Sequence, residues 1–320
     1  MSKAIVIGGA GFIGSNLVDY IIDNKSYDEV VVVDDMSTGR EENLNDKAFH
    51  YRCDFGDTEL YCEEFSDADV VFHLAAKARV QPSIQDPVSF DRVNVHSLVK
   101  LLKGCVDKGV KNFVFSSSSS VYGDTEKFPT PETAELMPMS PYGLQKLIGE
   151  QYCKLFSQIY KINTCCLRYF NVYGERMLNE GAYCLVMGTF DKLKKEGKPL
   201  TIYGDGSQLR DFTYVKDVAK ANVLAAEYIS DFDSSCIETD NIVCGEIYNI
   251  GNGDNRSIQQ IADMYGGPFE YLPARLEPFK TLADNSQARS VLKWQPSMDV
   301  ETWLKGHLGV FDPSEYEQSK

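Results

Sequence analysis

A phenol and an ammonium group stand four residues apart in the stretch SPYGLQKLIGE (140–150). If this stretch is a helix, Tyr142 and Lys146 emerge from the same face, one turn apart. A free tyrosine has a pKa near ~10, and an adjacent cation stabilises the phenolate and lowers that pKa. Tyr142 could then take a proton from a hydroxyl group and return it. Ser118, which follows a predicted buried strand at 112–116, could hydrogen-bond the same oxygen.

The N-terminal stretch predicts where such a substrate would meet a cofactor. Residues 3–7 (KAIVI) are typical of a buried parallel strand, and they are followed by GGAGFIG (8–14) and by a helix-like pattern. The glycines at 8, 11 and 14 allow a tight turn and a close approach to a pyrophosphate, whose charge would face the helix N-terminus. Asp34 ends a second strand twenty residues after Gly14, where a carboxylate binds ribose hydroxyls. Dinucleotide binding is therefore predicted, with NAD favoured over its 2'-phosphorylated form.

The order of the remaining elements favours a doubly wound parallel sheet of the Rossmann type. Further strands are predicted at 50–53, 69–74 and 162–174, with a long helix at about 86–108. The loop at 75–83 follows a strand, at the edge of the sheet where ligands of such folds bind. The regular alternation of predicted strands and helices stops after the strand at 162–174. We therefore expect an NAD-binding domain at 1–172 and a smaller α/β substrate lobe at 173–320, with some segments returning to the first domain.

Composition excludes several classes of partner. The 320-residue chain has a net charge of -15, which disfavours nucleic acid and anionic membrane surfaces. Its nine cysteines form no C-x-x-C pair and its four histidines are scattered, so no metal site or disulfide framework is predicted. No leader or membrane-spanning run is evident, and we expect a cytoplasmic protein. An acidic insertion at 231–240 and a frayed tail at 311–320 are also expected.

Several motifs taken together resemble the extended short-chain dehydrogenase/reductase family, and within it the nucleotide-sugar epimerases and dehydratases. The resemblance covers nearly the whole chain and rests on GGAGFIG, HLAA, SPYGLQK, LRYFNVYG, IYGDGSQLRDFTYVKDV, YNIGNG and TLADNSQA. Ser118, Tyr142 and Lys146 match its catalytic set. The positions that match its NAD-binding set are Gly8, Gly11, Phe12, Ile13, Gly14, Asp34, Asp54, Phe55, Ala75, Lys77, Asn94, Tyr142 and Lys146.

The same resemblance assigns residues to the sugar nucleotide. Asn171, Arg210 and Arg275 match positions that hold its diphosphate, and both arginines are predicted on loops. Asp54 and Phe55 would flank the adenine of NAD. Asn94, a polar residue in an apolar helix, would brace the Ser118 loop or lie on a solvated surface.

The residues after Ser118 indicate which reaction to expect. Dehydratases that resemble this chain carry an Asp-Glu pair there, because removal of water needs a second acid and base. Here the two places hold Ser119 and Ser120. The resemblance therefore implies NAD-dependent 4-epimerisation of a UDP-hexose. A UDP-glucuronate 4-epimerase, another nucleotide-sugar epimerase or reductase, and a catalytically silent NAD-binding protein are the alternatives.

Two departures from the family pattern bear on the sugar. Arg79 stands where the family more often has a small residue, and it would meet a substrate carboxylate or pair with a nearby acid. Thr281 stands where a bulky residue closes the pocket of some relatives, so an N-acetyl group is expected to fit.

The assembly is also an expectation from resemblance. Relatives pair through two helices of each subunit, which implies a homodimer. The apolar residues of 88–106 and 144–155 would form that interface, or would only be the core-facing stripes of these helices.

Overall fold

The structure, a computed structural model, describes residues 2–179, 184–231 and 244–310. At its centre is a seven-stranded sheet in the order β10-β6-β5-β4-β1-β2-β3, in which all neighbouring strands are parallel. The strands are β1 (Lys3–Ile7), β2 (Glu29–Asp34), β3 (Phe49–Arg52), β4 (Val70–His73), β5 (Asn112–Ser118), β6 (Asn163–Tyr169) and β10 (Cys244–Ile250). This order confirms the Rossmann-type α/β fold predicted from the sequence.

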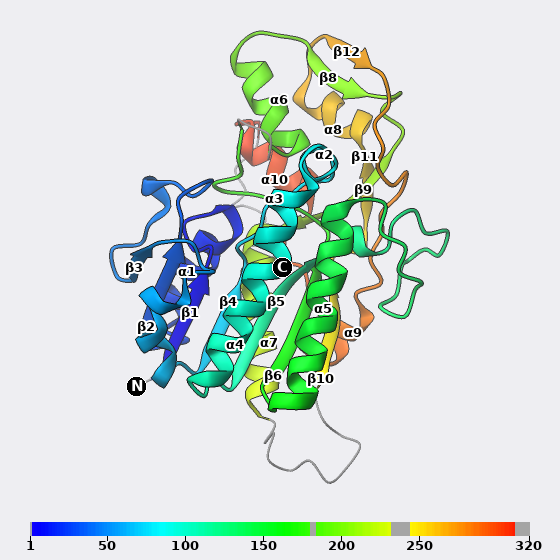
Figure 1. Cartoon of the computed structure of the whole chain (residues 1–320). Coiled ribbons are helices and arrows are strands. Elements are labelled where there is room, and N and C mark those ends of the chain that lie inside the picture. Colours follow the sequence, from blue (N-terminus) through cyan, green and yellow to red (C-terminus); the bar gives the residue numbers. More distant parts are fainter. Residues whose placement is uncertain (1, 180–183, 232–243, 311–320) are drawn as a thin grey trace.

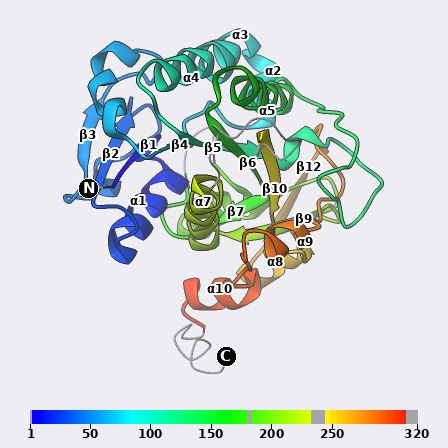
Figure 2. The ribbon, with the colours of Figure 1, turned by 90° about the horizontal axis from the view of Figure 1, so that it is seen from below.

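Helices cover both faces of this sheet (Figure 2). One face packs against α1 (Phe12–Asn24) and α7 (Val215–Ser230), and the other against α4 (Leu98–Asp107) and α5 (Pro141–Tyr160). Because side chains alternate between the two faces and both faces are covered, the central strands place apolar side chains on each face. Val6 accordingly lies in the α1/α7 core and Ile5 in the α4/α5 core.

A smaller lobe lies beyond the carboxyl ends of the strands, at the top of Figure 1. It contains a three-stranded sheet in the order β11-β9-β7 and a two-stranded sheet of β12 and β8. Its elements are β7 (Asn171–Tyr173), α6 (Val186–Lys195), β8 (Leu200–Tyr203), β9 (Leu209–Tyr214), β11 (Asn255–Ser257), α8 (Ile258–Tyr265), β12 (Phe269–Leu272) and α10 (Val300–His307). The chain leaves this lobe for α7 and for β10, which pairs with β6, and again for α9 (Ser286–Ser290), which lies beside β10.

The helix expected at 86–108 is not one regular α-helix. It consists of α3 (Pro87–Asp91), a π-helical segment (Arg92–Ser97) and α4. Likewise α2 (Val80–Gln85) begins within the loop expected at 75–83. Because α2 begins at Val80, the loop that follows β4 is shorter than expected. Its residues lie against the π-helical segment.

Two further expectations were wrong in detail. The strand expected at 162–174 is divided at Phe170, where β6 ends in the main sheet and β7 begins in the small one. The loop predicted to carry Arg210 ends before that residue, because β9 begins at Leu209 and pairs with both β7 and β11. Arg210 therefore lies on a strand.

The expected acidic insertion, apart from its first residue Asp231, and the expected tail fall outside the described residues. Among the helices that the structure describes, none has the length and apolar character needed to cross a membrane.

Candidate active site

β5 and α5 bring the three candidate catalytic residues to the carboxyl edge of the sheet. Ser118 is the last residue of β5. Ser140 caps α5 by accepting a hydrogen bond from the Gly143 amide at 3.1 Å, and a proline occupies the first turn. This start places Tyr142 at the end of the helix nearest Ser118, with Lys146 one turn deeper.

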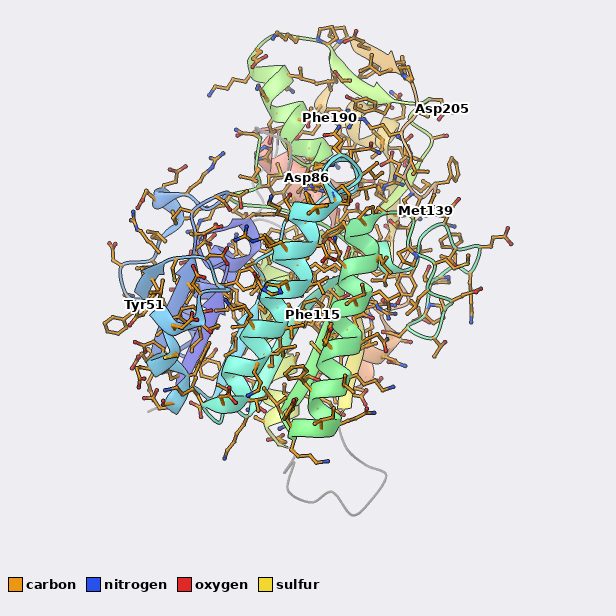
Figure 3. The ribbon with its side chains drawn as sticks, in the orientation of Figure 1. Tyr51, Asp86, Phe115, Met139, Phe190 and Asp205 are labelled. Atoms are coloured by element: carbon orange, nitrogen blue, oxygen red, sulfur yellow. The ribbon has the colours of Figure 1, made fainter. Side chains whose placement is uncertain are left out.

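Contacts within this group are specific. The Tyr142 hydroxyl interacts with that of Ser118, whose Oγ lies 2.9 Å from Ser120 Oγ. Lys146 Nζ donates to the Ser116 carbonyl oxygen at 2.7 Å and lies 4.9 Å from the centre of the Phe115 ring. Figure 3 labels Phe115, in the layer between the sheet and helices α4 and α5. Lys146 is thus held by strand β5 from below.

The electrostatics differ from the simplest expectation. Burial raises the pKa of Tyr142 above its ordinary value, while the Ser118 hydroxyl and the Arg79 guanidinium act in the opposite direction. Burial also lowers the pKa of Lys146 to about 8. The predicted lowering of the Tyr142 pKa by Lys146 is therefore corrected, because Lys146 is directed at the Ser116 carbonyl and Arg79 supplies the opposing cation.

The glycine turn has the shape of a pyrophosphate cradle. Gly8 has φ +86°, and a Cβ on Gly14 would lie 2.0 Å from the Gly8 carbonyl oxygen, so neither position accepts a side chain without rearrangement. Phe12 and Ile13 form the first turn of α1, which begins after Gly11. The glycines of this turn carry no side chain that would keep a phosphate away from the N-terminus of α1, where backbone amides attract anions.

Asp34 fastens this turn to β2. Its Oδ2 accepts a hydrogen bond from the Ala10 amide and its Oδ1 from the Met36 amide, both at 2.9 Å. Burial raises the pKa of Asp34, and these amides partly offset the effect. A carboxylate fixed beside a glycine turn at the end of β2 fits the ribose of a dinucleotide.

The π-helical segment places Asn94 against the loop after β4. Its Oδ1 accepts from the Lys77 amide, and its Nδ2 donates to the Lys77 carbonyl oxygen, both at 2.9 Å. Nδ2 also donates to Gln145 of α5 at 3.0 Å. Asn94 therefore braces the Lys77 loop and not the Ser118 loop, and the alternative of a solvated surface residue is excluded because Asn94 is buried.

The other candidate cofactor residues line the same edge. The Ala75 amide donates to the carbonyl of Ile7 at 2.9 Å. Asp54 Oδ1 accepts from the Gly56 amide at 2.7 Å. The Phe55 ring is buried against His73, with ring centres 4.9 Å apart, so its side chain belongs to the core. Lys77 Nζ donates to Ser89 Oγ at 2.9 Å.

Arg79 has an unusual backbone. Its φ of 90° and ψ of 139° lie in a region that side chains rarely adopt. Its guanidinium interacts electrostatically with Tyr142 and Cys184, and burial lowers the pKa of Arg79. A strained backbone that holds a half-buried cation beside Tyr142, the candidate catalytic tyrosine, favours a role at the sugar.

The two diphosphate candidates have different surroundings. Arg210 is buried, pairs with Glu277 at 3.0 Å and donates to the Phe279 carbonyl at 3.2 Å. Arg275 lies on the loop after β12 with its guanidinium over the Tyr203 ring, 3.2 Å from the ring centre. Both arginines thus contact the same lobe, one from a strand and one from a loop.

Thr281 joins the remaining candidates. Its Oγ1 accepts from Asn171 Nδ2 at 3.2 Å and from the Asp211 amide at 3.0 Å. Asn171, on β7, also donates to the Asp211 carbonyl at 3.1 Å.

A buried ion pair lies beneath the catalytic strand. Glu150, one turn after Lys146, accepts from Arg168 Nε at 2.8 Å and from a terminal guanidinium nitrogen at 2.7 Å. It also accepts from Ser117, the neighbour of Ser118. Arg168 in turn donates to the hydroxyl of Tyr122, in the loop after Ser118, at 2.8 Å. The pair therefore links β5, α5, β6 and the loop that carries Ser120.

Sequence reasoning did not find several residues of this site. Ser83 accepts the Tyr142 amide at 3.2 Å, although 59 positions separate them in sequence. Gln145 was missed although it lies beside Lys146, because only the fold shows that it meets Asn94. Within the described ranges no group of three or more His, Cys, Asp or Glu side chains could hold a metal ion.

Comparison with known proteins agrees with this geometry. The sequence profile of the NAD dependent epimerase/dehydratase family matches residues 4–251. The UDP-glucose 4-epimerase of Thermotoga maritima, solved with UDP-glucose, is 36% identical, with a TM-score of 0.85 over 98% of this chain and 99% of that one. The UDP-N-acetylglucosamine 4-epimerase of Methanobrevibacter ruminantium M1, solved with UDP-N-acetylmuramic acid, is 34% identical, with a TM-score of 0.85 over 97% and 98%.

A third solved structure is the UDP-glucuronic acid 4-epimerase of Bacillus cereus, in complex with UDP-glucuronic acid and NAD. It is 31% identical, with a TM-score of 0.83 over 98% of this chain and 99% of that one. The glycine turn, the Asp34 carboxylate and the extent of these matches agree, and the chain belongs to the NAD dependent epimerase/dehydratase family, with NAD as its cofactor.

Proposed function

We propose that this chain interconverts UDP-hexoses that differ at carbon 4, with UDP-glucose and UDP-galactose as the first pair. The observation that carries the proposal is the arrangement of Ser118, Tyr142 and Lys146 at the carboxyl edge of the sheet, with Ser120 as the next side chain. Serine hydroxyls in place of a second acid and base leave one proton-transfer group, Tyr142. That set is sufficient for one reversible oxidation and insufficient for removal of water.

The residues of this chain take defined roles. NAD, when bound, accepts a hydride from a carbon that bears a hydroxyl group and can return it. Tyr142 Oη would remove the proton of the sugar 4-hydroxyl and later return it, while Ser118 Oγ orients the same oxygen. Lys146 lies one helical turn deeper, where the Ser116 carbonyl holds its ammonium group, and the Arg79 guanidinium would stabilise the phenolate. Gly8, Gly11, Gly14 and Asp34 would hold the dinucleotide.

Epimerisation also requires the sugar to present both of its faces while the nucleotide stays bound. Arg210 and Arg275 are the cations that the substrate lobe offers to a diphosphate, and Asn171 and Thr281 lie beside them. A diphosphate held by the lobe leaves the sugar as the part able to turn.

The test is product analysis by NMR, without added reductant, on UDP-glucose, UDP-galactose, UDP-N-acetylglucosamine and UDP-glucuronate. We expect interconversion of UDP-glucose and UDP-galactose. Tyr142→Phe should reduce the rate by about 10²–10⁴-fold, the range for loss of a general acid-base group, while NAD remains bound. Net formation or consumption of NADH would instead indicate a reductase, and NAD binding with no turnover of any sugar would indicate a silent binder.

A second substrate, UDP-glucuronate, is favoured by one observation. Arg79 is a half-buried cation that interacts electrostatically with Tyr142, and a cation beside the group that would act on the sugar favours binding of a sugar carboxylate. The Bacillus cereus relative acts on UDP-glucuronic acid. If Arg79 binds the carboxylate, Arg79→Gln should lower kcat/KM for UDP-glucuronate by at least about tenfold more than for UDP-glucose. Equal losses for the two sugars would contradict this assignment.

Acceptance of N-acetylated sugars rests on Thr281. The Methanobrevibacter relative is a UDP-N-acetylglucosamine 4-epimerase, and a threonine leaves room that a bulky side chain would fill. We expect Thr281→Tyr to reduce turnover of UDP-N-acetylglucosamine more than that of UDP-glucose. If the wild-type protein converts UDP-galactose well but does not convert UDP-N-acetylglucosamine, the proposal that N-acetylated sugars are accepted is wrong.

The homodimer is proposed on the helices that face solvent. Leu144, Leu155 and Ile159 lie exposed along α5, and Val88 of α3 is 78% exposed beside it. A repeated apolar stripe on neighbouring helices is the pattern of a helix-bundle interface. Leu155→Glu with Ile159→Glu should give monomers in light scattering. Phe49→Glu, at an exposed apolar position on β3, is the control and should leave the dimer intact.

Two further assignments are part of the proposal. Residues 1–172 would form the NAD-binding domain and 173–320 the substrate lobe, with α7 and β10 returned to the first domain. The pairing of β10 with β6 and the packing of α7 on α1 support this division. A cytoplasmic location is supported by the seven cysteines whose side chains the structure describes, all of which are free thiols.

A further inference from the structure

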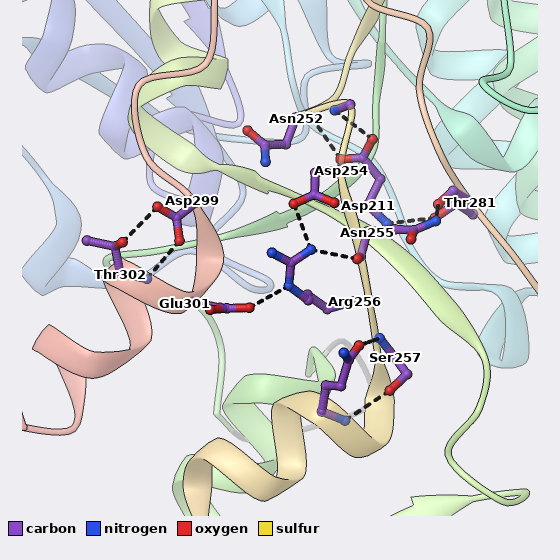
Figure 4. Close-up of polar contacts among 12 residues, drawn as sticks. Asp211, Asn252, Asp254, Asn255, Arg256, Ser257, Thr281, Asp299, Glu301 and Thr302 are labelled. Carbon is purple, nitrogen blue, oxygen red and sulfur yellow. Dashed lines mark hydrogen bonds and ion pairs between the residues drawn. The ribbon is translucent and has the colours of Figure 1, made fainter. Parts of the chain in front are cut away.

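Asp211 is a buried carboxylate that the proposed mechanism does not use. It lies on β9, next to Arg210, and is 0% exposed. Its Oδ1 accepts from the Asn252 amide at 2.8 Å, and its Oδ2 accepts from the amides of Gly253 and Ala283 at 3.0 and 2.9 Å (Figure 4). A carboxylate with three backbone donors is well satisfied, and it joins three separate parts of the chain.

The main chain of Asp211 extends these links to the candidate substrate residues. Its amide donates to Thr281 Oγ1 at 3.0 Å, and its carbonyl accepts from Asn171 Nδ2 at 3.1 Å. Arg210 is its neighbour on the strand. Every candidate for the sugar nucleotide in the lobe, apart from Arg275, is therefore either bonded to Asp211 or adjacent to it.

We propose that Asp211 is a positioning residue for the sugar nucleotide, because its carboxylate fixes the loops at 252–253 and 281–283 against β9. The second loop carries Thr281, which accepts a hydrogen bond from Asn171 of β7, and β9 carries Arg210. This inference rests on the proposed function, since it assigns the substrate that these residues would hold.

Asparagine is the informative substitution. The amide has nearly the same shape as the carboxylate but only one acceptor oxygen. If that oxygen keeps the bonds to Gly253 and Ala283, the NH₂ group faces the Asn252 amide, donor against donor. The loop after β10 should then move, while the backbone of β9 stays in its two sheet pairings.

The experiment compares the full-length wild type, Asp211→Asn and Asp217→Asn. Asp217 is a matched control because it is also a buried carboxylate, 2% exposed. It accepts hydrogen bonds from the backbone amide of Ser297 at 2.8 Å and from the Ser297 hydroxyl at 2.6 Å. Its contacts hold the segment before α10 and include none of the candidate substrate residues. The measurements are kcat and KM with UDP-glucose, UDP affinity by calorimetry, and hydrogen exchange of peptides that cover 251–253 and 281–284.

We expect Asp211→Asn to raise KM and to weaken UDP binding by about tenfold or more, with kcat within about threefold of wild type, the signature of lost substrate positioning. Exchange in both loops should accelerate. Asp217→Asn should leave KM, UDP affinity and exchange in these loops unchanged, even if its melting temperature falls by a similar amount.

Unchanged KM and UDP affinity in Asp211→Asn would overturn the inference, and so would an equal rise of KM in Asp217→Asn. If the wild type neither binds UDP nor converts a UDP-sugar, the proposed function fails and this inference falls with it. Should Asp211→Asn not accumulate as a folded protein, Thr281→Val removes the acceptor of the Asp211 and Asn171 bonds. It must then raise KM with kcat preserved, or the inference is wrong.

Discussion

Glu150 and Asp211 are both buried carboxylates, 2% and 0% exposed, yet the protein satisfies them in different ways. Glu150, beneath β5, is paired with the guanidinium of Arg168. Asp211, on β9, is bonded by three backbone amides of the loops at 252–253 and 281–283. One acid is neutralised by a full charge and the other by dipoles alone.

The two solutions have different electrostatic consequences. Burial lowers the pKa of Arg168, but the hydrogen bonds and charge of Glu150 outweigh this and raise it above its ordinary value. Burial raises the pKa of Asp211 to about 7, and its amide donors offset only part of the shift. The Arg168 guanidinium therefore keeps its charge over the ordinary pH range, whereas the Asp211 carboxyl, with a pKa of about 7, titrates near neutral pH.

The largest effect is expected when the ion pair is broken. Arg168→Met leaves the Glu150 charge buried without its partner, which should reduce the free energy of unfolding by about 3–5 kcal/mol. Denaturant unfolding measures it. The control is Lys103→Met, which removes an exposed ion pair with Asp107 and should change stability by less than about 1 kcal/mol. A loss as small as that of the control would show that the buried pair is not the anchor.

A smaller effect should distinguish Asp211 by its pH dependence. Its ordinary pKa of 3.8 applies to the unfolded chain and the value of about 7 to the folded one. Between these values the folded state alone holds the proton, so the stabilisation is full below the lower pKa and is lost as pH rises through the higher one. The stability of the wild type relative to Asp211→Asn should thus fall by about 2 kcal/mol between pH 5 and pH 8.

This comparison isolates Asp211, because the other titratable groups are common to both proteins. Denaturant unfolding of the two proteins at several pH values measures the difference. If the difference in stability between the wild type and Asp211→Asn were constant from pH 5 to pH 8, Asp211 would be ionised throughout. Backbone amides would then stabilise a buried carboxylate as well as a guanidinium does.

The smallest change is expected when both charges of the ion pair are removed together. Glu150→Met with Arg168→Met leaves no unpaired charge and fills the space with apolar atoms. Its stability should lie within about 1.5 kcal/mol of wild type, since apolar replacement of a buried pair is often neutral. Together with the two single variants it completes a double-mutant cycle. If the double variant were as unstable as Arg168→Met, the loss of stability would come from the broken hydrogen bonds to Ser117 and Tyr122 and not from an unpaired charge.

Local patterns in the sequence were sufficient for the cofactor half of the molecule. The strand at 3–7, the glycine turn and Asp34 lie within some thirty residues and follow the period of one βαβ unit, so their meeting could be predicted. Tyr142 and Lys146 share a helix face because of helical geometry alone. Such predictions succeed because the residues are close in sequence, so the regular geometry of one helix or one βαβ unit determines where they lie relative to one another.

Only the tertiary structure decided the partners of these residues. The amides that hold the Asp211 carboxylate lie 41, 42 and 72 positions away, in loops without periodicity. Arg79 meets Tyr142, Asn94 meets Lys77, and Arg210 lies on a strand for the same reason. Hydrogen bonds between distant segments depend on how strands align and where loops end, and these are set by packing of the whole core. The sequence by itself therefore determined which residues have the spacing of a dinucleotide turn and of one helix face, and the fold decided which groups hold them.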